Sequence, residues 1–150
     1  MQPIAFQVVA DAEDPHGLAR FWADALGWTL EDNDAFVRSA LKAGYATGDD
    51  VVELDGRKFW RTVAAIRHPD DPYHPQRGSG LGRRMLFQLV PEHKQVKNRW
   101  HLDLNVGREH INTTVSRLRD LGATELYQVD EPGAFHTTMQ DPEGNEFCVQ

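Results

Sequence analysis

The chain has 150 residues, enough for one globular domain with a hydrophobic core that folds without disulfide cross-links. Its single cysteine, Cys148, excludes an internal disulfide, and its net charge of -7 argues against nucleic acid as a partner. No apolar run approaches the ~20 residues of a membrane span, and the first ten residues do not resemble a signal peptide, so we expect a cytoplasmic protein with no membrane partner.

The chain begins with a predicted strand, helix and strand. Residues 4–10, IAFQVVA, have the apolar, β-branched character of a buried strand. Asp14 can cap the helix that follows, with Pro15 in its first turn. The helix ends at Gly27, which suits a left-handed cap, and residues 28–31, WTLE, predict the next strand. An apolar stripe at helical spacing supports the helix: Leu18, Phe21, Trp22, Ala25 and Leu26.

A second helix and a hairpin are predicted next. Residues 32–44, DNDAFVRSALKAG, have a helical apolar face, with Asp34 as the expected cap and Gly44 at the end. Residues 51–66 predict a hairpin, because Asp55-Gly56 is a favoured sequence for a type I′ turn.

A long loop precedes the strand that closes the first half. Residues 67–84 are rich in proline, glycine and charge, which predicts a loop, and residues 85–90, MLFQLV, predict a strand. The connector 91–99 holds the largest basic cluster, which is either solvated or attracts an anionic ligand. This cluster consists of Lys94, Lys97 and Arg99.

The second half repeats the plan of the first. Residues 101–106, HLDLNV, alternate as a strand does, and a helical stripe that ends at Gly122 precedes a strand at 124–129. Residues 134–140 and 146–150 flank the turn DPEGN and predict a hairpin. The stripe consists of Ile111, Val115, Leu118 and Leu121.

The two halves also share a short sequence signal. ALGWTL and DLGATEL both place Leu-Gly at a helix end, which suggests an internal repeat offset by about 95 residues. We therefore expect a first module over about 1–92, with an inserted helix and hairpin in about 33–84, and a second module over about 99–150.

Three stretches carry a resemblance to a known family: DPHGLARFWADALGW, LFQLVPEHKQVKNRWHLDL and DPEGNEFCV. With the two β-α-β-strand halves, they resemble the vicinal oxygen chelate superfamily and its bacterial glyoxalase-like branch. The resemblance covers essentially the whole chain. It implies an α+β fold in which two βαβββ modules form cupped sheets, as a single glyoxalase-like domain over residues 1–150. Function is a separate question, because one fold hosts many chemistries.

The resemblance also implies residues at the floor of the cup, where many members of the superfamily hold a divalent metal. It puts Gln7 at the ligand position of the first strand and His101 at the equivalent position of the second half. Cys148 stands where the closing strand normally offers a glutamate, and Gln88 is the counterpart in the first half.

The missing glutamates weaken the implied metal site. Carboxylates neutralise a divalent cation, and a glutamate also serves as the base in glyoxalase-type chemistry. Glu146 is taken to face the other side of its strand and is left out of the set. A weak site of His101, Gln7 and Cys148, for Zn²⁺, Ni²⁺, Fe²⁺ or Mn²⁺, stays open as an alternative to no metal at all.

The residues and the resemblance together favour a protein that binds a small organic molecule in its cup and lacks glyoxalase I activity. One alternative is a metal-dependent lyase, isomerase or dioxygenase that uses His101, with His136 as a weak candidate for the base. Another is a resistance protein that sequesters a drug. Whether the protein is an enzyme is left open, and a homodimer is expected. The expected pocket residues are Gln7, Gln88, His101 and Cys148, joined by Trp60, Phe87 and Trp100, whose rings either stack on a ligand or belong to the core.

Overall fold

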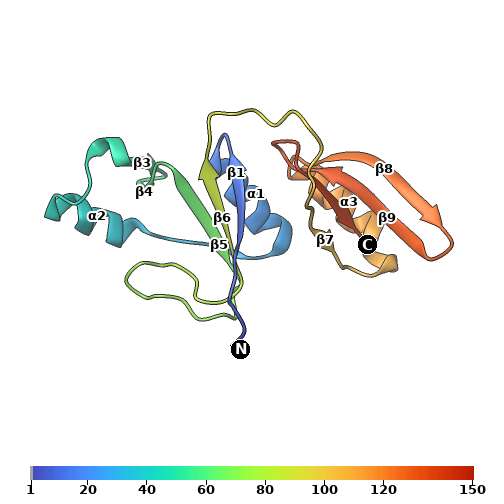
Figure 1. Cartoon of the computed structure of the whole chain (residues 1–150), viewed down its shortest axis with the longest axis horizontal. Helices are drawn as coiled ribbons and strands as arrows, with labels where there is room; N and C mark the ends of the chain where they lie inside the picture. Colours follow the sequence, from blue (N-terminus) through green and yellow to red (C-terminus); the bar gives the residue numbers. More distant parts are fainter. Residues whose placement is uncertain (1) are drawn as a thin grey trace. The chain divides into compact units, whose positions relative to one another are not determined.

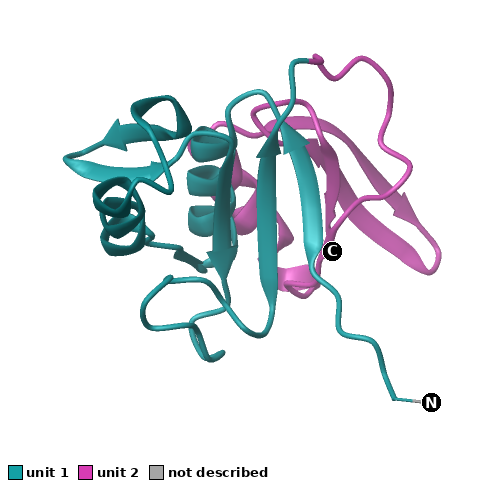
Figure 2. Ribbon diagram, turned by 60° about the vertical axis from the view of Figure 1, so that its left-hand side comes forward, with its two compact units in different colours: residues 1–91 teal, residues 92–150 magenta. Residues whose placement is uncertain are grey.

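The computed structural model describes residues 2–150 (Figure 1). The chain divides into two compact units, Met1–Pro91 and Glu92–Gln150, which are coloured separately in Figure 2. None of the helices in the described part of the chain has the length and apolar character needed to cross a membrane.

The first unit is built on a four-stranded sheet in the order β1-β6-β5-β2. Strand β1 runs parallel to β6, whereas the β6-β5 and β5-β2 pairs are antiparallel. Helix α1 contacts β5 and β6 and covers one face of this sheet. The elements are β1 (Val8–Ala12), α1 (Pro15–Leu26), β2 (Thr29–Leu30), β5 (Val63–Arg67) and β6 (Arg84–Leu89).

Helix α1 confirms its prediction at both ends. Asp14 occupies the N-cap and its side chain accepts a hydrogen bond from the Gly17 N–H, with Pro15 in the first turn. Gly27 ends the helix in the left-handed conformation at φ 66°, which a glycine adopts without strain. The predicted stripe is buried through Leu18, Phe21, Trp22 and Ala25, so the helix is held by its apolar face.

Strand β1 differs from the buried strand predicted over 4–10. Its pairing with β6 begins at Val8, and the described residues before it, 2–7, have no strand partner, so the strand starts and ends later than predicted. Ile4 and Phe6 are both 88% exposed rather than buried.

A separate hairpin and a helix lie between β2 and β5. The turn between β3 and β4 has positive φ at Asp55 (51°) and Gly56 (75°), which confirms the type I′ prediction. The hairpin ends at Trp60, however, and does not extend to residue 66 as predicted, because β5 joins the main sheet. The elements are α2 (Asp34–Ala43), the short 3-10 helix η1 (Gly48–Asp50), β3 (Val51–Leu54) and β4 (Arg57–Trp60).

The cap of α2 is also displaced by one residue. Asn33 occupies the N-cap, and Asp34, expected to be the cap, is the first helical residue. The carboxylate of Asp34 accepts hydrogen bonds from the Lys58 N–H on β4 and from Arg38 one turn later. It therefore attaches the hairpin to the helix, a long-range role that a local capping rule does not predict.

Strand β5 lies within the range of about 33–84 that the sequence suggests as an insertion. Ala64, Ala65 and Ile66 are nonetheless buried, and β5 pairs with both β2 and β6. The residues outside the sheet therefore form two stretches, 31–62 and 68–83, on either side of β5.

The second unit has the same sheet order as the first. Its strands are arranged β7-β10-β9-β8, with β7 parallel to β10 and the other pairs antiparallel. Helix α3 contacts β8, β9 and β10 and buries Ile111, Val115 and Leu118, as its stripe predicts. The elements are β7 (Asp103–Leu104), η2 (Arg108–His110), α3 (Ile111–Asp120), β8 (Thr124–Glu131), β9 (Ala134–Gln140) and β10 (Glu146–Val149).

The two units thus confirm the α+β fold of two modules with equivalent topology. In each, the first strand pairs in parallel with the last, and the helix follows the first strand. Strand β7 is shorter than the predicted 101–106, so His101 lies just before a strand rather than within one.

Candidate functional site

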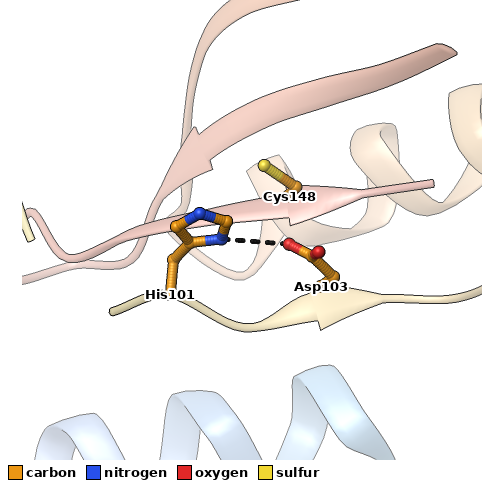
Figure 3. Close-up of side chains that lie close together, drawn as sticks. All are labelled: His101, Asp103 and Cys148. Atoms are coloured by element: carbon orange, nitrogen blue, oxygen red, sulfur yellow. Dashed lines mark hydrogen bonds and ion pairs between the residues drawn. The ribbon is translucent and has the colours of Figure 1, made fainter. Parts of the chain in front are cut away.

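Three side chains of the second unit with metal-binding atoms lie close together (Figure 3). His101, Asp103 and Cys148 each offer one such atom, and these atoms all lie within 4.8 Å of one another. The Nδ1 atom of His101 is 3.0 Å from Oδ1 of Asp103, as the dashed line in Figure 3 marks. A search of the described residues for His, Cys and carboxylate groups that could together hold a metal ion finds this one cluster.

The pairing of β7 with β10 brings these residues together. Asp103 is the register partner of Cys148, and the Cys148 N–H donates to the Leu102 carbonyl at 2.9 Å. Because alternate residues of a strand share a face, His101 lies on the same side as Asp103, two residues later. The site therefore joins two segments that are more than forty residues apart in the sequence.

The cluster is accessible on one side. The side chains of His101 and Asp103 are 41% and 43% exposed, and Cys148 is half-buried. Oγ1 of Thr138 on β9 is 3.7 Å from Sγ of Cys148, a hydrogen bond in which either atom can donate. The thiol is thus oriented by a neighbouring strand, while the imidazole and the carboxylate remain open to solvent.

This donor set fits a divalent cation. A thiolate and a carboxylate together carry two negative charges, and imidazole adds a neutral ligand. Catalytic zinc sites use three protein ligands and keep one position for water or substrate. The competing interpretation is an ordinary ion pair between His101 and Asp103, with Cys148 beside it.

Asp103 is the candidate ligand that the predicted set of site residues did not include. It supplies a carboxylate in a site whose expected glutamate is replaced by Cys148. The signal for it is present in HLD, because two residues of a strand separated by one share a face.

The exclusion of Glu146 from this face is wrong. Glu146 and Cys148 are two residues apart on β10, and the residues that alternate with them, Phe147 and Val149, are the buried ones. Glu146 and Cys148 therefore point to the same side of the sheet.

Glu146 is nevertheless engaged elsewhere. Its carboxylate accepts hydrogen bonds from the Asn98 N–H at 2.9 Å and from the Lys94 ammonium, which lies 3.1 Å from Oε2. Burial would raise the pKa of Glu146, but the hydrogen bonds from Asn98 and Lys94 outweigh it and lower the pKa to about 2. A carboxylate this acidic is a poor general base near neutral pH.

The first unit has a counterpart of the cluster, but without its ligands. Strands β6 and β10 begin with the same alternation of half-buried and buried residues, which aligns Leu86 with Cys148. The register partner of Leu86 is Val9, and Gln7 lies two residues earlier, as His101 does before Asp103. The equivalent of the His, Asp and Cys set is therefore Gln7, Val9 and Leu86.

The two glutamines of the predicted set are far apart in this unit. Oε1 of Gln7 accepts a hydrogen bond from Nη1 of Arg84 at 2.9 Å. Gln88 pairs with Asp11, four residues beyond Gln7 on the parallel neighbour, which separates the two by about 13 Å at the usual rise of a strand. Gln7 and Gln88 belong to the first unit and His101 and Cys148 to the second, so their joint set stays a prediction.

The three aromatic candidates have different surroundings. Trp60 lines a cavity of the first unit, together with Phe36 and Leu86. Phe87 has no exposed surface and belongs to the core on the helix-covered side of the sheet, which leaves its ring nothing to offer a ligand. Trp100 is 91% exposed.

His136, the candidate base, lies on β9 two residues before Thr138. Thr138 is the register partner of Cys148, so His136 is a diagonal neighbour of Cys148 on the same face. Diagonal neighbours of a sheet are about 7–8 Å apart, outside direct ligand distance. Its role as a base stays a prediction.

The two βαβββ modules have the same sheet order, and in the second module a candidate ligand cluster lies where the first and last strands pair. This arrangement defines a protein of the vicinal oxygen chelate class. The sequence model of the glyoxalase-like domain matches residues 7–150. The chain therefore belongs to the glyoxalase-like domain family. A search of the curated proteins finds no match.

Solved structures share this fold at low sequence identity. A glyoxalase/bleomycin resistance protein/dioxygenase family enzyme from Burkholderia phytofirmans PsJN is 13% identical with a TM-score of 0.58, over 95% of this chain and 94% of that one. The fosfomycin resistance protein FosX from Listeria monocytogenes, in a complex with Mn(II) and 1S,2S-dihydroxypropylphosphonic acid, is 10% identical with a TM-score of 0.59, over 100% and 90%. A bleomycin-binding protein from Streptomyces verticillus, with copper(II)-bleomycin, is 14% identical with a TM-score of 0.53, over 100% and 97%.

Proposed function

We propose that the protein binds a small organic molecule next to a divalent metal ion held by His101, Asp103 and Cys148. The proximity of the three ligand atoms, all within 4.8 Å of one another, carries this proposal. Asp103 supplies the carboxylate that the predicted ligand set of Gln7, His101 and Cys148 lacked. The set of His101, Asp103 and Cys148 therefore supports a metal site more strongly. FosX with Mn(II) and a phosphonic acid supports such a site in this fold.

The ligand chemistry favours Zn²⁺ among the candidate metals. Thiolate and imidazole are preferred ligands of Zn²⁺, whereas Mn²⁺ prefers oxygen ligands. Ni²⁺ and Fe²⁺ are the alternatives. When bound, the ion would act as a Lewis acid toward an oxygen atom of the ligand.

The proposal excludes glyoxalase I activity. That chemistry needs a base beside the metal, and Glu146, the glutamate on this face of β10, is held as a carboxylate of low pKa by Lys94 and Asn98. The same observation favours a second candidate function, in which the protein sequesters a ligand without transforming it. The bleomycin-binding protein from Streptomyces verticillus, in its complex with copper(II)-bleomycin, is a structural neighbour that supports this candidate. A metal-dependent lyase, isomerase or dioxygenase with His136 as base is the remaining alternative.

Two further expectations belong to this proposal. A cytoplasmic location would keep Cys148 reduced and able to bind the metal. A homodimer would give the exposed apolar side chains of Ile4, Phe6 and Trp100 a surface to pack against.

Elemental analysis of the purified full-length protein tests the metal. We expect about one Zn²⁺ per chain, and for Co²⁺-substituted protein a thiolate-to-cobalt absorption band. His101→Ala, Asp103→Asn and Cys148→Ser should each weaken metal binding by more than the ~10–100-fold that loss of a ligand's hydrogen-bonding partner causes. His110→Ala, which removes an exposed imidazole of the same unit, should leave binding unchanged.

Two results would contradict the proposal. The first is substoichiometric metal that the three variants do not alter and that added Zn²⁺, Ni²⁺, Mn²⁺ or Fe²⁺ does not restore. The second concerns the reaction: turnover of the methylglyoxal–glutathione adduct that disappears in His101→Ala would show that a base is present after all.

A further inference from the structure

The first unit contains a cavity of about 130 Å³ that the metal proposal does not use. Its floor is the face of the sheet opposite α1, where Val63, Ala65 and Leu86 present small and apolar side chains. Trp60 from β4 and Phe36 from α2 form its walls, with their ring centroids 6.1 Å apart. The elements inserted between β2 and β5 thus give this sheet face an aromatic cover.

One ion pair at the cavity is complete. Glu31 is 3% exposed, and its two oxygens accept hydrogen bonds from Nε and Nη2 of Arg84 at 2.7 and 2.8 Å. Glu31 also accepts from the Gly80 N–H at 2.6 Å. The charges of Glu31 and Arg84 cancel, so this pair leaves no charge for a ligand.

Arg77 is the remaining cation of the cavity. Its Cζ atom lies 5.5 Å from the centroid of the Phe36 ring, a cation–π contact. Within the described part of the chain, no carboxylate pairs with its guanidinium. A guanidinium at the edge of an aromatic cavity is a ready partner for one carboxylate, which it can bind through two parallel hydrogen bonds.

The backbone around Arg77 is fixed in place. Nδ2 of Asn33 donates to the Arg77 carbonyl at 2.6 Å. Gly78 has φ 74°, and a Cβ there would collide with the Asp32 carbonyl oxygen, so only glycine permits this approach of the loop to residues 31–33. Together with the Gly80 contact, these interactions hold the loop 68–83 against the cavity.

We propose that this cavity binds a small aromatic monocarboxylate. The ring would lie on Val63, Ala65 and Leu86, beside the contacting rings of Trp60 and Phe36, and the carboxylate would pair with Arg77. The size agrees, because an engineered cavity of about 150 Å³ holds benzene. A single cation without a paired carboxylate favours a ligand with one negative charge over a dianion. This inference concerns the first unit and does not depend on the metal.

Benzoate is the probe, and benzamide is its neutral control of the same shape. Titration calorimetry at low salt measures both dissociation constants, and the ¹H–¹⁵N signal of the Trp60 indole, identified by its absence in Trp60→Leu, locates the site. The experiment uses full-length Cys148→Ser protein freed of metal, so that failure of the metal proposal does not affect its outcome. We expect benzoate to bind at least ~10-fold more tightly than benzamide and to shift the Trp60 signal.

Variants separate this site from general anion binding. Arg77→Gln should raise the dissociation constant of benzoate at least ~10-fold, because a charge-assisted hydrogen bond is lost. The dissociation constant of benzamide should not change. Trp60→Leu should weaken both ligands by about 2- to 10-fold through lost stacking. Lys42→Gln removes the same charge from an exposed position on α2 and should change neither.

Either of two outcomes would overturn the inference. One is benzoate affinity that is equal in the parent protein and in Arg77→Gln, with both proteins folded by circular dichroism. The other is an equal loss of affinity in Arg77→Gln and Lys42→Gln, which would show an unspecific response to net charge.

Discussion

Glu31 is a buried carboxylate whose stability contribution depends on its partner Arg84. The Glu31 side chain is 1% exposed and that of Arg84 18%, so removal of either charge leaves the other in a poorly solvated place. We expect Glu31→Gln to lower the free energy of unfolding by about 3–5 kcal/mol, measured by urea denaturation. Glu53→Gln is the matched control, because the Glu53 side chain, paired with Lys58, is 58% exposed, and its substitution should lower the free energy of unfolding far less. Equal effects in the two variants would contradict the role of burial.

At the scale of single residues, the sequence predicted the positions that a local pattern or the resemblance defines. His101 and Cys148 do lie together, as the resemblance implies. Asp103 was left out because the ligand set was taken from the family resemblance, although the alternation of HLDLNV places Asp103 on the face of His101, and Glu146 was excluded by a misapplied alternation. The partners of Glu146 in the connector, Lys94 and Asn98, are 52 and 48 residues away in the sequence and leave no local signal.

At the scale of elements, the connector before β7 is attached to β10 through Glu146. The folded-state pKa of Glu146, about 2, lies below its ordinary value of 4.5, because the hydrogen bonds from Asn98 and Lys94 outweigh burial. The carboxylate therefore contributes stability that is complete above about pH 5 and is lost as the pH falls toward 2, on the order of 3 kcal/mol in full.

Glu146→Gln tests this acid sensitivity. The variant should be less stable than the parent protein at pH 7, and the difference should shrink as the pH falls from about 5 toward 2. Urea unfolding over this range measures it, and amide exchange at Asn98 should report the loosened connector. Glu131→Gln, at an exposed position of β8, should have the same free energy of unfolding as the parent protein at every pH. A difference between parent and Glu146→Gln that does not vary with pH would contradict the assignment.

Helices were predicted more accurately than strands, for a physical reason. The limits of α1 depend on Asp14, Pro15 and Gly27, which are all local to it. The limits of β1 depend on where β6 begins, more than seventy residues later, and the membership of β5 in the main sheet depends on partners on both sides. Strand limits are therefore properties of the sheet and not of the segment.

At the scale of the whole chain, the two units are versions of one module with different chemistry at equivalent positions. The second unit has His101, Asp103 and Cys148 where the first has Gln7, Val9 and Leu86. Only the second set combines thiolate, carboxylate and imidazole. The first unit has instead an apolar floor, covered by residues of α2 and β4 and edged by Arg77.

This equivalence predicts that the first unit can be given a metal site. The triple variant Gln7→His, Val9→Asp, Leu86→Cys places the same donor types at the same register positions, and Val9 is 49% exposed, so its aspartate would be solvated. If the second unit binds about one Zn²⁺, the triple variant should bind about two, measured by elemental analysis. The same triple variant with Cys148→Ser should return to about one, now in the first unit. A folded triple variant that still binds one ion would show that equal strand register does not suffice to align the three side chains. The positions of the Asp103 and Cys148 ligand atoms around His101 would then depend on contacts that the first unit lacks, such as the hydrogen bond between Thr138 and Cys148.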